Sequence, residues 1–513
     1  MGSAQHFPST WGAYGQTTFG ELAEAVGGYR PSDILVRVGQ WSKKLDDYQR
    51  EHGNRPMPVN LPRHVARDGR DQGINVAHSL LALIARLSLI RGYGLAPGHL
   101  TDDAFLRLLR TGCELWEPAD DALNAEYVLR VMYEQAPYQD DVWQALPRAK
   151  LMYVDACDTL TAPEMDIAVE FEERFGLTID SFITIGFALF AQLFTDPVFY
   201  PLVHWHTGVR GMRDVLTKDN VNAFLNIVAV NQQRFRDEDV KLRPAGINEG
   251  RYDFNPLFKY PVIDLGGGKC TAPLANLVVW RLYTAPFYEL ADAFMEEGPQ
   301  NRFRAFFGHV YQSYIGLLLR DALPHKDVLP EVGGDSVGPV DWVARIGTHA
   351  LLIECRTRDL TLRAKSTGDL AVIESDVEKI AVDTIRKLPK KMKFLQERAG
   401  DYGLQDIDTW HALVVLKEPL LPVTHVRELI DGKLGKPVGY HLLSTADFEQ
   451  LMALHGAVGI HQVLSDKAAA SEMGKDFRTF FHERRDKYPF RRNPLLRRTS
   501  DEFFARFGID PEG

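Results

Sequence analysis

Two apolar runs separated by a tight turn constrain the fold more than any other part of this sequence. Residues 340–346 and 350–356 are strand-like, and Gly347-Thr348 lies between them. A two-residue loop that begins with glycine favours a type II′ turn. That turn fixes the hairpin register, so Asp341 is predicted to lie directly opposite Glu354. Their Cβ atoms would be about 5 Å apart, with both side chains on one face.

Two carboxylates at that separation repel each other unless a cation lies beside them. Carboxylate oxygens are the ligands that Mg²⁺ and Mn²⁺ prefer, so the pair predicts a divalent cation site. Arg356 follows Glu354 by two residues and is expected on the same face. A purely structural interpretation stays open, in which Arg356 makes an ordinary ion pair with Asp341 or Glu354 in a half-buried hairpin.

Asp341, followed by Glu354-Cys355-Arg356 at the end of an apolar strand, resembles the motif of the PD-(D/E)XK nuclease superfamily, which has the restriction-endonuclease-like fold. The order of the predicted elements also resembles that fold. These elements are an opening helix at 303–323, the hairpin, a helix at 376–387 begun by a capping box at 375–378, and a strand at 410–416.

The resemblance implies metal-dependent hydrolysis of DNA phosphodiester bonds, with DNA rather than RNA as the expected substrate. Asp341, Glu354 and the main-chain carbonyl of Cys355 would hold Mg²⁺ or Mn²⁺. Arg356 would stabilise the negative charge of the transition state, because arginine stays protonated.

The chain departs from the family pattern at two catalytic positions. Arg356 stands where the family has a lysine, and Lys365 and Lys379 are the candidates to supply that lysine from elsewhere. Gln312 stands on the opening helix where family members often have a metal-binding glutamate.

The net charge of −10 is confined to the first part of the chain. Residues 1–300 carry 28 basic and 39 acidic side chains, whereas residues 301–513 carry 31 and 30. In the second part the basic residues are grouped, some near aromatic residues, a pattern typical of contact with a phosphate backbone or of a solvated surface. The candidates for nucleic-acid binding are Lys387, Lys390, Lys391, Lys393, Arg484, Arg485, Lys487, Arg491 and Arg492.

Hydrophobic periodicity predicts an α+β protein. Residues 1–299 are expected to form a mostly helical regulatory, sensor or partner-docking region, 300–470 an α/β nuclease domain, and 471–513 a helical, basic C-terminal segment. Within the first region, residues 1–60 are expected to be irregular. Helices are predicted at 73–91, 122–134 and 220–235, a helix start with a capping box at 161–164, and two strands around the glycines at 266–268.

Cysteine usage and hydropathy predict a cytoplasmic protein with no membrane contact. The four cysteines are scattered and form no CxxC pair, which argues against a disulfide framework and a structural zinc site. No signal peptide is visible at the N-terminus. The most apolar stretch, 181–194, is shorter than the roughly 20 residues that cross a bilayer.

A nuclease inside a cell has to be restrained, and the long acidic region suggests how. The arrangement resembles regulated effectors of bacterial anti-phage defence, in which nuclease domains are joined to sensing modules. The expected partners are DNA and either a second protein subunit or further copies of the chain. The alternative is a catalytically inactive nuclease fold that acts as a nucleic-acid-binding or assembly subunit.

Overall fold

The predicted hairpin lies at the centre of a five-stranded sheet in the computed structural model of the chain. Strands β8 (Val340–Ile346) and β9 (His349–Arg356) pair antiparallel, with Ile346 opposite His349. Gly347 has a φ of +60°, and among the described non-glycine residues only Glu331 has a positive φ. Gly347 thus has a positive φ and Thr348 a negative one. This identifies a type II′ turn, because a type I′ turn requires a positive φ at both residues. The predicted register is confirmed.

The structure describes residues 18–53, 55–62, 65, 73–92, 98–115, 132–133, 136–138, 142–160, 165–201, 212–243, 250, 253–296, 302–334, 337–420, 423–435, 438–469 and 471–508. The chain forms two compact units. The first comprises Met1–Ala145 and Glu172–Ala285, and the second comprises Leu146–Phe171 and Pro286–Gly513. The regions expected from the sequence are divided differently, after residues 299 and 470.

The first unit is mainly helical and contains two small sheets. Its helices are α1 (Phe19–Gly27), α2 (Pro31–His52), α3 (His78–Arg91), α4 (Asp102–Cys113), α9 (Ile179–Leu193), α11 (Lys218–Val228) and α12 (Gln232–Leu242). Its strands are β1 (Met57–Asn60), β2 (Gly73–Val76), β3 (Val198–Phe199), β4 (Ala229–Asn231), β5 (Val262–Gly266) and β6 (Lys269–Thr271). The helices α6 (Val142–Lys150), α8 (Ile167–Phe175) and α13 (Ala275–Glu296) each cross a boundary between the units.

Three predictions for this unit are wrong and one is confirmed. Residues 18–53 form α1 and α2, not irregular chain, and α2 begins at Pro31, whose fixed φ suits the first helical turn. Residues 73–76 pair with β1 as a strand before α3 begins. The predicted helix at 220–235 is interrupted by β4, which pairs with β5. The strands on either side of the glycines at 266–268 form as expected. The predictions at 122–134 and 161–164 lie outside or almost outside the described residues.

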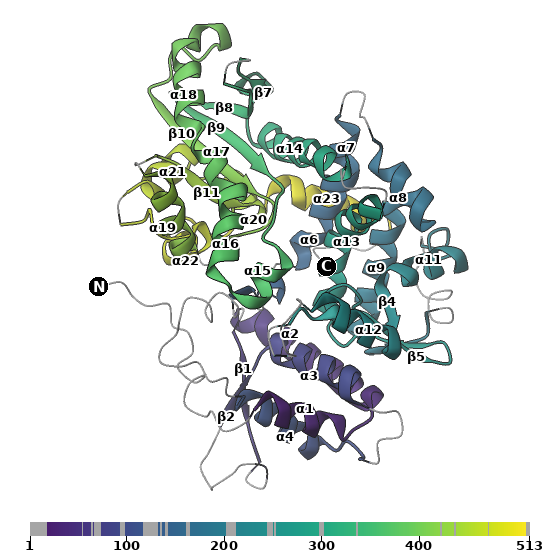
Figure 1. The fold of residues 1–513 in the computed structure, drawn as a ribbon. Helices are drawn as coiled ribbons and strands as arrows, with labels where there is room; N and C mark the ends of the chain where they lie inside the picture. The colour runs from purple at the N-terminus through teal and green to yellow at the C-terminus, as the bar shows by residue number, and fades with distance from the viewer. Residues whose placement is uncertain are drawn as a thin grey trace. The chain divides into compact units, whose positions relative to one another are not determined.

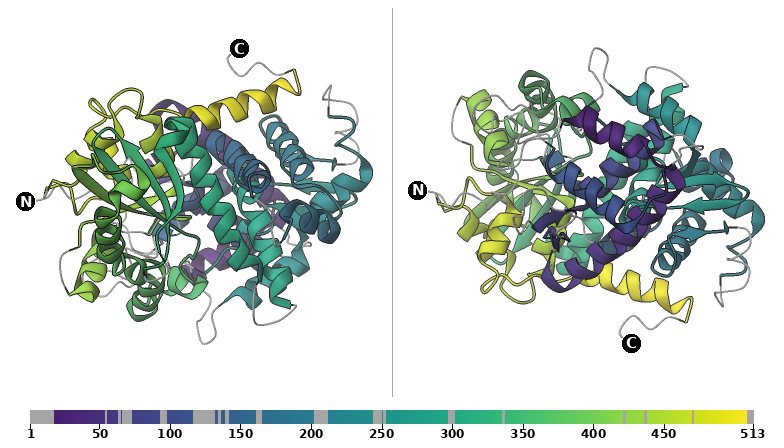
Figure 2. Two further views of the ribbon diagram at one scale, coloured as in Figure 1. Left: turned by 90° about the horizontal axis from the view of Figure 1, so that it is seen from above. Right: turned by 90° about the horizontal axis from the view of Figure 1, so that it is seen from below.

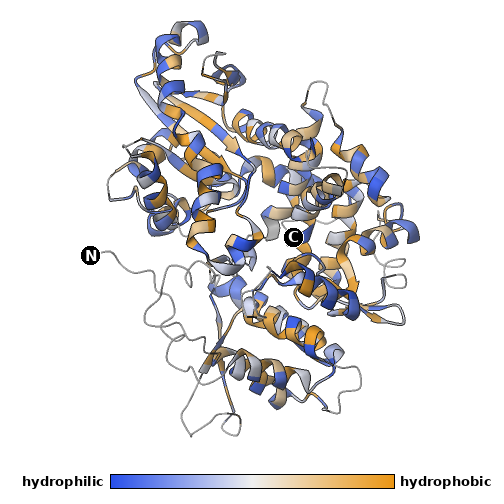
Figure 3. Ribbon diagram, viewed as in Figure 1, coloured by the Kyte–Doolittle hydropathy of each residue, from blue (hydrophilic) through white to orange (hydrophobic). Residues whose placement is uncertain are grey.

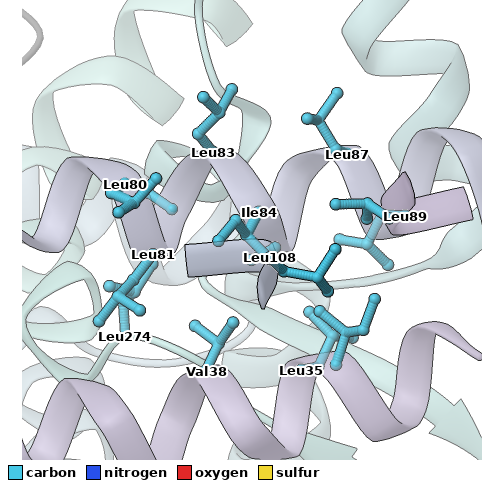
Figure 4. Packing of buried hydrophobic residues seen from close by; sticks show 14 of the residues in the cluster. Leu35, Val38, Leu80, Leu81, Leu83, Ile84, Leu87, Leu89, Leu108 and Leu274 are labelled. Atoms are coloured by element: carbon cyan, nitrogen blue, oxygen red, sulfur yellow. The ribbon is translucent and has the colours of Figure 1, made fainter. Parts of the chain in front are cut away.

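Helix α3 is the centre of the first unit's core. Every residue from His78 to Leu89 is buried, so α3 is covered by neighbours on all sides. Its leucines pack against side chains of α2 and α4, among them Leu35, Val38 and Leu108 (Figure 4). No single described helix is long and apolar enough to cross a membrane, although α8 and α9, which meet at 65°, pass that test together as a bent pair.

The second unit is built around a mixed sheet in the order β11-β10-β9-β8-β7. Strand β7 (Val328–Val332) pairs antiparallel with β8, and β8 pairs antiparallel with β9. Strands β10 (Thr409–Leu416) and β11 (His441–Ser444) continue the sheet parallel to β9 (Figure 1). Strands β8, β9 and β10 are hydrophobic along most of their length, as expected for strands covered on both faces (Figure 3).

Helices cover both faces of this sheet (Figure 2). The helices that lie wholly within this unit are α7 (Ala156–Asp158), α14 (Arg302–Ala322), α15 (Leu362–Thr367), α16 (Leu370–Val377), α17 (Asp383–Ile385), α18 (Leu388–Glu397), α19 (Val423–Leu434), α20 (Thr445–Ala453), α21 (Ile460–Lys467), α22 (Phe477–Glu483) and α23 (Pro494–Ala505). Two π-helical segments, Leu151–Asp155 and Glu378–Val382, join α6 to α7 and α16 to α17.

The opening helix and the strand after the hairpin form within one or two residues of the predicted bounds, as α14 and β10. The helix predicted at 376–387 begins earlier, at Leu370, because Asp369 accepts hydrogen bonds from the main-chain N–H groups of Ala371 and Val372. Ser375 therefore lies inside a helix and does not cap one. The chain is thus a mostly helical α+β protein with mixed sheets.

Three histidines form a diagonal row across the face of the sheet that carries Trp342. His349, His411 and His441 lie on β9, β10 and β11, and His349 Nδ1 is 3.3 Å from His411 Nε2. His461 of α21 packs against His349, with ring centroids 4.9 Å apart. Burial, followed by the neighbouring imidazoles, lowers the pKa of His411 to about 4 and that of His441 to about 3. The row is therefore uncharged at neutral pH.

Replacing Gly316 with alanine is expected to destabilise the protein by about 1–3 kcal/mol, because the added Cβ would lie 2.3 Å from a carbon of the Trp342 ring. Gly308 on the same helix has nothing within 4 Å of an added Cβ. Gly308→Ala is therefore the matched control and should be neutral or stabilising by up to about 1 kcal/mol. Urea denaturation followed by circular dichroism measures both, and equal effects would contradict the packing of α14 on β8.

The histidine row predicts a loss of stability in acid. The unfolded chain takes up protons near the ordinary histidine pKa of 6.5, whereas His411 in the folded protein resists protonation until about pH 4. Stability should therefore fall as the pH is lowered through this window. The other charged groups near the row are Asp408 by His349, and Lys467 and Arg427 by His441.

The variant His411→Gln should make the urea midpoint less dependent on pH between 6.5 and 4.5. His482→Gln, at an exposed position of α22, is the control and should leave that dependence unchanged. The same pH dependence in His411→Gln as in the wild type would contradict a role for this row in acid sensitivity.

Candidate active site

The two predicted acids lie together on one face of the sheet. The hydrogen-bonded ladder of β8 and β9 ends at Trp342 and Ile353, one pair before Asp341 and Glu354. Beyond that point the Asp341 side chain, and not the main chain of β8, joins the two strands: its Oδ2 accepts a hydrogen bond from the Cys355 main-chain N–H at 2.6 Å. The Asp341 side chain remains 22% exposed, so solvent reaches one acid of the pair.

Glu354 is the buried member of the pair, with only 1% of its side chain exposed. Its two carboxylate oxygens are bound by two different cations. Arg356 Nη2 lies 3.0 Å from Oε2, and Lys391 Nζ lies 2.5 Å from Oε1. A buried carboxylate without such partners would be strongly unfavourable, so the two cations offset the cost of burying Glu354.

Arg356 contacts four groups of the protein. Its Nε donates to the Thr384 hydroxyl of α17 at 2.6 Å, and its Nη1 donates to the Cys355 carbonyl at 2.7 Å. The remaining Nη2 contacts Glu354, and Nη1 is also 3.8 Å from Asp341. Thr384 was not among the predicted site residues, and it fixes the guanidinium between the two acids.

The pKa of Asp341 is raised mainly because the carboxyl group is buried. Burial, and after it the nearby charge of Glu354, raise this pKa to about 6. The Cys355 N–H, Arg356 and Lys391 act in the opposite direction without cancelling this effect. A cation beside Asp341 would favour the ionised form of this carboxyl group, because an opposite charge lowers a carboxyl pKa.

Lys391 is the site residue whose role sequence reasoning missed. The prediction placed it with the exposed lysines of a nucleic-acid path, but its side chain is only 9% exposed and also donates to the Pro339 carbonyl at 2.6 Å. A signal was present: Leu388, Lys391 and Leu395 recur at helical spacing on the buried face of α18. A lysine in an apolar stripe indicates a buried charge that has a partner.

The other predicted catalytic residues lie less directly at the acids. Gln312 Nε2 donates to the Asp341 carbonyl at 3.3 Å, so the opening helix does reach the site through this amide. Lys365 Nζ instead binds Glu418 at 2.7 Å, in a separate network with Lys417. Lys379 is exposed, and no contact joins it to either acid in the described part of the chain.

The remaining basic candidates divide into paired and unpaired side chains. Lys393 lies 3.7 Å from Glu397, Arg484 lies 2.8 Å from Glu472, and Lys487 pairs with Asp466. The other five candidates are exposed and form no ion pair within the described structure: Lys387, Lys390, Arg485, Arg491 and Arg492.

The donor set of the site suits a hard divalent cation. Asp341, Glu354 and the Cys355 carbonyl offer the oxygen ligands that Mg²⁺ and Mn²⁺ take. Among the described residues, no three His, Cys, Asp or Glu side chains are arranged to hold a metal ion. The side chains that would bind one here are the two acids alone.

Comparison of the chain with models of protein families, with curated proteins and with solved structures gives no match in any of the three. What this site does is therefore inferred from its residues and its geometry.

Removing the Lys391 charge should leave Glu354 buried and short of a partner. Lys391→Met is expected to destabilise the protein by roughly 3–5 kcal/mol, the usual cost of breaking a buried ion pair. The neighbouring Lys390 is exposed, so Lys390→Met is the control and should change stability by no more than about 0.5 kcal/mol.

A double-mutant cycle with Glu354→Gln isolates the pair. In that background Lys391→Met should cost far less, because the partner is no longer charged. Additive effects of the two substitutions in urea denaturation would contradict a direct interaction between them.

Proposed function

We propose that this protein is a metal-dependent nuclease that hydrolyses DNA phosphodiester bonds at Asp341 and Glu354. The observation that carries the proposal is the placement of these two carboxylates on one face of a mixed sheet, with an arginine and a lysine beside them. Cleavage of a phosphodiester requires a hard cation and fixed positive groups near the charge that develops on phosphate. The sequence of α14, three antiparallel strands, helices and a parallel strand supports the resemblance to the PD-(D/E)XK superfamily.

Each residue of the site has a role that follows from its position. Asp341 is the acid that solvent reaches, so it would be the first ligand of an incoming cation, and Glu354 the second. When bound, Mg²⁺ or Mn²⁺ polarises a phosphate and lowers the pKa of water. Arg356, oriented by Thr384, would stabilise the charge on the phosphate oxygens. Lys391 would serve as the family lysine, supplied from α18 instead of β9.

The site also suggests a restrained enzyme. Both oxygens of Glu354 and the Cys355 carbonyl already accept hydrogen bonds from Arg356 or Lys391. A metal ion that binds these oxygens competes with the two cations, so the arrangement lowers the metal affinity of the site without closing it. We therefore extend the proposal to a regulated effector, of the kind found in bacterial anti-phage defence, whose low activity rises when a trigger rearranges the site.

The same observation favours a second candidate function. If Arg356 and Lys391 permanently take the place of the metal, the fold would be catalytically inactive and would act by binding nucleic acid. Cleavage and binding measured on the same samples separate the two candidates.

Even without a trigger, the full chain should cleave plasmid and linear DNA slowly in Mg²⁺ or Mn²⁺. Asp341→Asn and Glu354→Gln should each lower that rate at least about 100-fold. Asp401→Asn, at an exposed position of the same unit, is the matched control and should retain the wild-type rate.

Equal cleavage by the wild type and both site variants would assign the activity to another site and contradict the proposal. Absence of cleavage in every condition, together with retained DNA binding, would support the inactive candidate instead.

A further inference from the structure

The loop between α22 and α23 displays an aromatic ring to solvent. Phe490 is 66% exposed, whereas Tyr488, two residues earlier, is fully buried. Tyr488 packs on Phe480, with ring centroids 5.4 Å apart, and its hydroxyl donates to Asp466 at 2.5 Å. One aromatic residue thus anchors the loop in the core while the other remains outside. A surface that covers the Phe490 ring would remove its apolar area from water, which is favourable.

The main chain on both sides of Phe490 is fixed by a single side chain of α20. Gln450 Nε2 donates to the Pro489 carbonyl at 3.1 Å, and Gln450 Oε1 accepts from the Arg491 N–H at 3.2 Å. Gln450 is itself buried. Three residues beyond Phe490, Asn493 Nδ2 donates to the Glu449 carbonyl at 3.1 Å. The ring is therefore presented from a fixed main chain, which lowers the entropic cost of binding something against it.

Positive charge surrounds the exposed ring. Arg485, Arg491 and Arg492 are exposed, and none has an ion-pair partner within the described structure. The two other basic residues of the loop, Arg484 and Lys487, are paired with acids of neighbouring segments. Asp486 is the only acid among the ten residues of the loop, 484–493. Three uncompensated guanidinium groups thus lie on the same loop as a displayed aromatic ring.

We propose that this loop is a binding platform for single-stranded nucleic acid, in which Phe490 stacks on an unpaired base and Arg485, Arg491 and Arg492 bind flanking phosphates. Stacking on an aromatic side chain requires a base whose face is free, which a duplex does not offer. The combination of a fixed aromatic ring with arginines and few acids is the arrangement that binds single strands without reading their sequence. The inference rests on the proposed nuclease function and deepens it: the substrate would carry an unpaired segment.

The test uses the full chain with Asp341→Asn, so that binding is measured without turnover. A fluorescently labelled 20-nucleotide DNA of mixed sequence and its duplex are titrated by anisotropy at two salt concentrations. We expect the single strand to bind more tightly than the duplex. Adding Phe490→Ala should weaken single-strand binding about tenfold with the salt dependence unchanged. Adding Phe490→Trp should retain it.

Arg491→Ala should instead weaken binding and lower the salt dependence, by about 0.7 in the logarithmic slope for one phosphate contact. Met473→Ala removes another exposed hydrophobic side chain of the same unit and should change nothing.

Two results would overturn the inference: duplex bound as tightly as single strand, or single-strand binding unchanged by Phe490→Ala. A third result would also overturn it and assign the ring to a protein interface: concentration-dependent self-association in sedimentation that Phe490→Ala abolishes, without an effect on DNA. The proposed nuclease fails separately, if cleavage by the chain with native Asp341 does not depend on that residue.

Discussion

A buried carboxylate sets the conditions that the second unit has to meet. Glu354 is 1% exposed at the centre of the mixed sheet, where an unpaired charge would be far more costly than a typical folding free energy can offset. Arg356 of the same strand and Lys391 of α18 form ion pairs with this carboxylate. Lys391 thus joins α18 to the sheet, and Thr384 joins α17 to the same point through Arg356. Ion pairs and hydrogen bonds add to the apolar packing of Leu388 and Leu395 on this face.

The two faces of the sheet accommodate polar groups in opposite ways. On the face of Glu354, charge is kept and compensated by cations. On the face of Trp342, the imidazoles of His349, His411 and His441 are kept neutral, because burial lowers their pKa. The charges that act most on the pKa of Asp341 are those of Glu354, Arg356 and Lys391.

The sequence predicts the hairpin and its register because a two-residue turn beginning with Gly347 leaves few alternatives. It does not predict β2, since residues 73–76 become a strand only by pairing with Met57–Asn60, a partner distant in the sequence. Lys391 was assigned to the surface for a similar reason. A run of lysines is usually solvated, and only the packing of α18 on the sheet shows that one of them is buried against Glu354. Local patterns thus located the acids, whereas tertiary contacts determined which cations neutralise them.

Calorimetric titration of the full chain with Mn²⁺ shows whether Asp341 and Glu354 together hold a divalent cation. We expect one Mn²⁺ to bind per chain, and this binding to be lost in Asp341→Asn and in Glu354→Gln but kept in Asp401→Asn. No binding to the wild type, or the same binding in the two acid variants, would contradict it and leave a sheet whose buried carboxylate serves structure alone.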